Sequence, residues 1–195
     1  MARKKSREAL GAEGDRGMNG LRRAAVLLEL RDQLSDRGSW CGETHLQKAT
    51  YFLQELLKVP MDFEFILYKH GPFSFELRDE LTAMRADGLI EIRSQRPYGP
   101  ALVTTDAGRE LKSEYPRTLE RYGDAINFVA RRLGSKNVSQ LERLATALFI
   151  TVADDSKSPE ERAEEVSELK PHIDLESAEA AVDEVDDMIR KANRP

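Results

Sequence analysis

Apolar residues recur every three or four positions along most of this 195-residue sequence, the spacing of amphipathic helices. The pattern predicts helices at 20–35, 44–58, 74–86, 106–111, 119–133, 141–148 and 175–189. Two stretches depart from it. Segment 62–69 places aromatic and aliphatic residues at alternate positions, as a strand does, and two short apolar runs at 89–93 and 101–104 flank a Pro/Gly loop, as in a β-hairpin. The sequence therefore predicts a mostly helical α+β protein with one small sheet.

Several of these helices have a recognisable start. Ser, Thr, Asp and Asn favour the N-cap position because their side chains accept a hydrogen bond from the first turn of the helix. A Glu three residues after such a cap completes a capping box. The expected caps are Ser74, Asp106, Asp174 and the capping boxes Ser139–Glu142 and Ser158–Glu161.

Charge is distributed unevenly along the chain, whose formal net charge is −5. Residues 1–23 contain seven Lys/Arg and three Asp/Glu, whereas residues 151–195 contain six and fourteen. The first 18 residues have almost no large apolar side chain, so we expect them to be a disordered basic leader. The expected organisation is a leader at 1–18 and a single domain at 19–195, made of a winged-helix-like core at 19–115 and a helical extension at 116–195.

Composition excludes several classes of protein. No run approaches the roughly 20 apolar residues that cross a bilayer, and the first twenty residues lack the apolar centre of a signal peptide. A single cysteine, Cys41, cannot form an internal disulfide framework. These observations favour a cytoplasmic protein that does not engage a membrane.

The residues that carry catalysis or bind metals are sparse. Cys41 and His45 could supply two metal ligands, but His70 and His172 lie far away in sequence, and zinc sites need three or four converging ligands. His70 and Ser74 are four residues apart across a turn, with no third group to orient them and no nucleophile elbow. The glycines are isolated and form no phosphate-binding loop. We therefore expect no enzyme activity, no cofactor and no metal.

The element order helix, helix, turn, helix, hairpin is that of a winged helix-turn-helix. In such a fold the helix at 74–86 would read DNA and residues 89–104 would form the wing. Residues 74–87 nevertheless carry two Arg against four Asp/Glu, which disfavours contact with phosphate. Arg93 and Arg96 on the wing are possible nucleic-acid contacts, and a second small basic cluster comprises Arg131, Arg132 and Lys136.

The turn between Tyr68 and Ser74 is the sharpest local feature. Gly71 permits a backbone conformation closed to other residues, Pro72 fixes the next φ angle, and Ser74 caps a helix. Turn chemistry alone can account for these residues. The alternative is a rim of polar groups that receives a partner's side chain. The candidate partner-binding residues are His45, Lys48, Tyr68, His70, Ser74, Arg78 and Arg85.

The segment His45–Phe52 (HLQKATYF), followed by Tyr68–Leu77 (YKHGPFSFEL), resembles the YwgA-like proteins and the related SocA-like (Panacea) antitoxin domain. Gly88-Leu89-Ile90 and Thr104–Gly108 (TTDAG) extend the likeness, which covers roughly residues 20–190. The resemblance implies a winged-helix-like fold and no established enzymatic activity. Panacea domains neutralise toxins or act as adaptors between proteins. The expected function is thus a non-enzymatic protein-interaction module, with a protein partner or self-association, and the alternative is a DNA-binding winged-helix regulator.

Overall fold

The structure is a computed structural model that describes residues 18–94 and 99–193. It is a mostly helical α+β protein, as the sequence predicts. Apart from Met18, which is buried, the predicted leader lies outside the described residues. The elements in chain order are α1 (Gly20–Asp36), α2 (Glu43–Glu55), β1 (Ile66–Tyr68), β2 (Gly71–Phe73), α3 (Phe75–Ala86), β3 (Ile90–Ser94), β4 (Pro100–Thr104), α4 (Asp106–Glu114), α5 (Pro116–Leu133), α6 (Val138–Ala153), α7 (Pro159–Leu169) and α8 (Leu175–Ala192).

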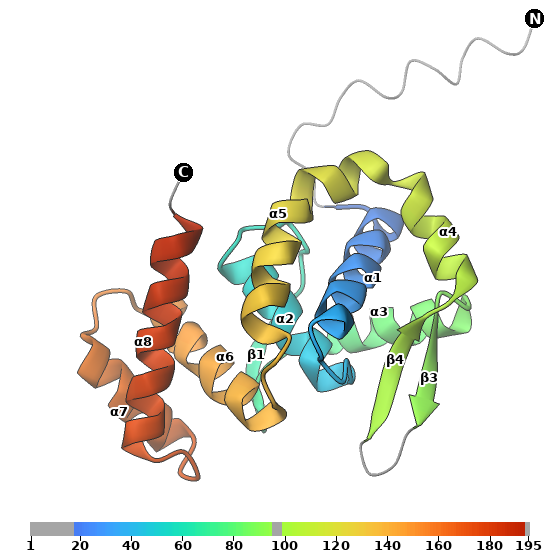
Figure 1. Cartoon of the computed structure of the whole chain (residues 1–195). Coiled ribbons are helices and arrows are strands. Elements are labelled where there is room, and N and C mark those ends of the chain that lie inside the picture. Colours follow the sequence, from blue (N-terminus) through green and yellow to red (C-terminus); the bar gives the residue numbers. More distant parts are fainter. Residues whose placement is uncertain (1–17, 95–98, 194–195) are drawn as a thin grey trace, which may run out of the picture.

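Helix α2 lies at the centre of the molecule. It contacts α1, α3, α5, α6 and β2, and every residue from His45 to Leu53 is buried. Its apolar stripe therefore accounts for only part of its burial, because the neighbouring elements also cover its polar side. Figure 1 shows α1, α2, α5 and α6 in the middle of the molecule, with the β3–β4 hairpin at one edge and the α7–α8 pair at the other. The pair packs mainly on α6.

The described strands form two separate antiparallel pairs rather than the one small sheet predicted. The predicted strand at 62–69 is confirmed only at Ile66–Tyr68, and the predicted turn between Tyr68 and Ser74 is present but does not include Gly71 and Pro72. Instead, Tyr68 pairs with Gly71, so that Lys69 and His70 form a two-residue turn and Pro72 lies within β2. Proline is tolerated there because a two-stranded sheet consists only of edges. The β3–β4 hairpin is confirmed, with Ile90 opposite Thr104.

Three of the expected caps are confirmed and two are wrong. The side chains of Ser74, Ser158 and Asp174 cap α3, α7 and α8. Thr105 rather than Asp106 caps α4, and the capping box of α6 is Asn137 with Gln140 rather than Ser139 with Glu142. Both true caps lie one or two residues earlier, which puts Glu142 in the second turn of α6, where it is buried. Helix α2 also ends at Glu55 rather than residue 58, because Lys58 has a positive φ of 55°.

Candidate functional site

The chain from Phe63 to Tyr68 turns alternate side chains inward and outward. Phe63 is buried in the core, Phe65 packs against the core, and Leu67 is less exposed than its two neighbours, in agreement with the alternation in the sequence. The outward positions differ in kind, because Glu64 is polar but Ile66 and Tyr68 are large and apolar, with exposed fractions of 42% and 54%. Outward positions of a half-buried strand are usually polar. This alternation thus leaves apolar groups on the surface.

Two glutamines of α2 hold this region by paired hydrogen bonds to a single residue each. The Gln47 side chain donates to the Ser74 carbonyl at 2.8 Å and accepts from the Ser74 N–H at 3.0 Å, and it is completely buried. Two turns later, Gln54 forms the same pair of bonds with Phe63, each at 2.9 Å. The amide side chains satisfy backbone groups that have no strand partner there. They fix both ends of the hairpin segment against α2.

Lys48 holds the hairpin itself. Its side chain is fully buried, and its ammonium group donates to the Pro72 carbonyl at 2.6 Å. Burial lowers the pKa of Lys48 to about 8, and the opposing effect of Glu142 only partly offsets this. A lysine in this position acts as a structural bridge between α2 and β2, because its nitrogen is out of reach of solvent.

The turn packs closely on α6 at Gly71. This residue has a φ of +82°, and a Cβ there would lie 3.1 Å from Thr146 Oγ1 and 3.4 Å from the Glu142 carbonyl oxygen. A larger residue would be strained in backbone conformation and crowded against the helix. Gly71 therefore allows the hairpin to pack closely on α6. This is the structural role that the sequence analysis set beside a role in partner binding.

A buried carboxylate lies beneath the turn. Glu142 Oε1 is 3.3 Å from His172 Nε2 and 3.9 Å from Lys170 Nζ, and its Oε2 is 3.5 Å from His70 Nδ1. Lys170, itself buried, donates to the carbonyls of Tyr68 and Lys69 at 2.6 and 2.8 Å. The hairpin is thus attached to α6 and to the segment between α7 and α8 as well as to α2.

Above this support, three aromatic rings form a cluster at the surface. The ring centroids of Tyr68, Phe73 and Phe75 are 5.2 to 5.8 Å apart in all three pairs. The guanidinium of Arg78 lies over the Phe75 ring at 5.0 Å. We call this group the aromatic surface, consisting of Ile66, Tyr68, Phe73, Phe75 and Arg78. Tyr, Phe and Arg are enriched at protein interfaces, so this composition is typical of a protein-binding surface.

The structure separates the candidate partner-binding residues into two groups. His45, Lys48 and Ser74 are buried and cannot form a rim that a partner reaches, so that expectation is wrong for these three. They are buried because neighbouring elements cover α2 on several sides. Burial lowers the pKa of His45, whose side chain hydrogen-bonds to the backbone of Lys136. The other four are exposed: Tyr68, His70, Arg78 and Arg85.

Sequence reasoning missed the residues that complete the site, namely Ile66, Phe73, Phe75 and Gln47. Two signals point to the exposed ones. Counting in twos from the apolar Phe63 places Ile66 among the outward-facing positions of the strand. Phe75 lies outside the buried stripe of α3, which consists of Leu77, Leu81 and Met84. No periodicity identifies Gln47, because its burial depends on elements far away in sequence.

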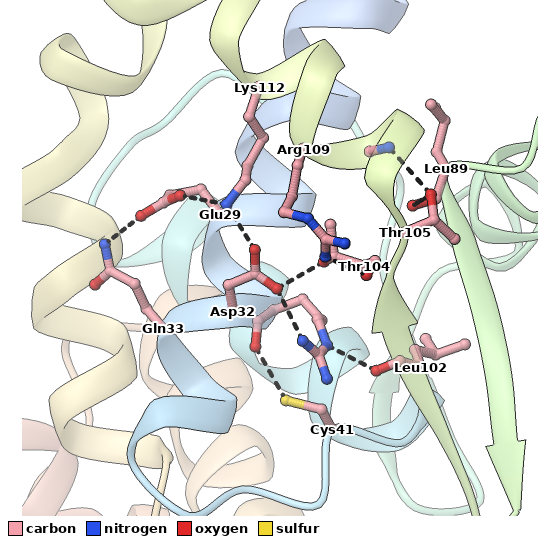
Figure 2. A network of polar contacts seen from close by, with 12 residues as sticks. Glu29, Asp32, Gln33, Cys41, Leu89, Leu102, Thr104, Thr105, Arg109 and Lys112 are labelled. Atoms are coloured by element: carbon pink, nitrogen blue, oxygen red, sulfur yellow. Dashed lines mark hydrogen bonds and ion pairs between the residues drawn. The ribbon is translucent and has the colours of Figure 1, made fainter.

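The β3–β4 wing is anchored to α1 and α4 by a polar network, which Figure 2 shows. Asp32 accepts hydrogen bonds from Lys112, Thr104 and Arg31, and Arg31 also donates to the Leu102 carbonyl. Burial alone would raise the pKa of Asp32, but these hydrogen bonds outweigh it and lower the pKa. The network keeps the wing in a fixed position relative to α1.

The nucleic-acid contacts expected on the wing are only partly described. Arg93 is exposed and pairs with Glu91 at 2.9 Å, so its charge is already partly compensated. Arg96 lies outside the described residues. On α3, Arg78 likewise pairs with Asp79, at 3.2 Å. Arg78 and Arg93 therefore lie beside carboxylates, an arrangement that does not favour contact with phosphate.

Because Lys48 is buried, we expect the stability of the fold to depend on pH in the alkaline range. Its folded-state pKa of about 8 lies below the usual value of 10.5, so the unfolded chain binds more protons between these limits. Stability should therefore rise with pH from about 8 to 10.5, by up to about 3 kcal/mol from this group. Chemical denaturation across that range should show the rise in the wild type, and the Lys48→Met variant should lack it. Identical pH profiles would show that Lys48 is not the source.

Other findings complete the description of the site. Within residues 18–94 and 99–193, no three or more His, Cys, Asp or Glu side chains are arranged to hold a metal ion. No helix in these ranges is both long and apolar enough to cross a membrane. No family model matches the chain, and no curated protein matches it.

Proposed function

We propose that this protein is a non-enzymatic, cytosolic protein-interaction module that binds a protein partner through the aromatic surface. The observation that carries the proposal is a surface cluster of three aromatic rings, of which Tyr68 and Phe75 are exposed and Phe73 is partly buried. The cluster is held in place from α2, α6 and the α7–α8 connection. Rigid aromatic groups lose little entropy when a partner binds, and they dominate binding energy at protein interfaces. The expected resemblance to YwgA-like and Panacea proteins agrees with such a role.

The surface extends along α3. Arg85 lies two helical turns beyond Arg78 and is exposed, so a partner that covers Phe75 can also reach both arginines. Acidic groups on the partner would then meet them at the rim. Rim charges mainly affect the rate of association, whereas the central rings supply most of the affinity.

Affinity capture from cells of the source organism tests the proposal. Exchanging both arginines for glutamate, Arg78→Glu with Arg85→Glu, should reduce capture of a specific partner at least fivefold, and more strongly at low salt. Arg117→Glu on α5 is a matched control with an exposed arginine on another helix. Equal capture by all three proteins would contradict the placement of the surface.

The same proteins test the DNA-binding alternative. If the chain binds duplex DNA, random duplex should bind at low salt with a steep dependence on salt concentration. We expect no measurable binding, because α3 carries more acidic than basic residues. Strong, salt-sensitive binding that Arg93→Ala reduces would favour the regulator and contradict the proposed function.

A further inference from the structure

A second surface feature lies on other elements, between the C-terminal parts of α5 and α8. It is a hollow of about 460 Å³ lined by Phe128, Arg131, Arg132 and Lys191. Three of these four side chains are cations, and none is an acid. This is unusual for a chain of net charge −5 whose last 45 residues contain fourteen acidic residues.

Two of these cations, Arg132 and Lys191, and the neighbouring Arg190 are paired with a single carboxylate. Asp187 Oδ2 is 2.7 Å from Lys191 Nζ and 3.3 Å from Arg132 Nη2, and its Oδ1 is 3.6 Å from Arg190 Nη2. Among the described residues, Asp187 is the only acid within ion-pair distance of these three. Its hydrogen bond from Lys191 lowers the pKa of Asp187, which favours its charged form. One negative charge thus faces three positive ones.

Arg131 adds a fourth positive charge. It is exposed, and within residues 18–94 and 99–193 its guanidinium has neither an ion pair nor a hydrogen bond. Arg132, in contrast, is oriented by Asp187 and by the Phe128 ring, whose centroid is 5.6 Å from its guanidinium carbon. Just beyond the end of α5, the charge of Lys136 is balanced by Glu184 of α8, at 2.8 Å. The excess of positive charge is therefore confined to the hollow.

We propose that this hollow binds the phosphate group of a small phosphate monoester. Guanidinium groups bind phosphate oxygens by charge-assisted hydrogen bonds, and two of them line this hollow together with a lysine ammonium that supplies a third donor. A monoester carries nearly two negative charges at pH 7, which offsets most of this excess of three positive charges. Phe128 offers an apolar wall to the organic part of the ligand, and the volume falls within the range of small-molecule sites.

The charge of the neighbouring surface restricts the size of the ligand. Helix α8 carries Glu176, Glu179 and Asp183 along the turns that precede the hollow. A long polyanion that followed the helix would meet these carboxylates, whereas a small ligand at its C-terminal end would not. The site therefore favours a small phosphorylated molecule over a nucleic acid.

Calorimetry and thermal denaturation with the full chain test this proposal, with inorganic phosphate, phenyl phosphate, adenosine monophosphate and a 20-nucleotide single strand as probes. The two monoesters should bind with measurable affinity and raise the melting temperature, with inorganic phosphate weaker. Arg131→Ala should weaken phenyl phosphate at least fivefold with little change in stability, because Arg131 holds nothing in the free protein. Arg117→Ala is the matched control and should change neither value.

Variants at Arg132 separate the contribution of charge to phosphate binding from that of the guanidinium geometry. Arg132→Lys keeps the charge but loses the two-pronged donor, so its affinity should fall between those of the wild type and Arg132→Ala. Three results would overturn the proposal: no binding of either monoester at millimolar concentration, affinities that Arg131→Ala and Arg132→Ala leave unchanged, or binding of the oligonucleotide alone.

Discussion

Replacing Gln47 with alanine should lower the free energy of unfolding by about 3 kcal/mol or more. The substitution leaves the N–H and the carbonyl of Ser74 without partners in a fully buried position. A buried backbone group that loses its hydrogen bond costs about 1–3 kcal/mol, and two such groups lose their partner in this variant. Urea denaturation followed by far-UV circular dichroism measures the change.

Gln54→Ala is the matched comparison for that prediction. Gln54 makes the same pair of bonds to Phe63, but its side chain is only partly buried, so water can replace it. We expect a loss of about 1 kcal/mol there. Equal losses for the two variants, or a loss below about 1 kcal/mol for Gln47→Ala, would show that the hairpin does not depend on this buried contact.

Replacing Tyr68 and Phe75 together with alanine should abolish partner binding while leaving the fold stable. Both side chains are about half exposed, so truncating them removes little buried area from the free protein. At an interface, each central aromatic anchor is worth about 2 kcal/mol, or about thirtyfold in affinity. Capture experiments together with thermal denaturation separate the two effects.

Val152→Ala serves as the control for this variant. Val152 lies on α6, with an exposed fraction of 47% that falls between those of Tyr68 (54%) and Phe75 (42%). It should leave capture unchanged. If the Tyr68/Phe75 variant captured the same partner as well as the control, the aromatic surface would not be the binding site.

Much of the fold follows from local pattern. The helical spacing predicted the positions of α1, α3 and α8, and turn residues predicted the β3–β4 hairpin, because each of these signals lies within a few residues. The prediction of the short β1–β2 sheet was less successful. Its second strand, Gly71–Phe73, carries the residues of a turn, and it is a strand only because Gln47, Lys48 and α6 hold it in place.

The candidate site was predicted less well, and for a similar reason. Tyr68, His70, Arg78 and Arg85 are exposed as expected, because each lies in a short turn or on the outer side of a helix. His45 and Lys48 are polar residues on a helix with a clear apolar stripe, which predicts exposure. Their burial results from contacts of α2 with elements up to about a hundred residues away.

Photo-crosslinking in cells tests the central claim most directly. A benzophenone side chain is introduced at position 75 in one protein and at position 152 in another, so that each replaces an exposed apolar residue. If the partner binds at the aromatic surface, position 75 should give a discrete crosslinked product and position 152 should give none. A product from position 152 alone, or the same products from both positions, would contradict the proposal that this protein binds its partner through the aromatic surface.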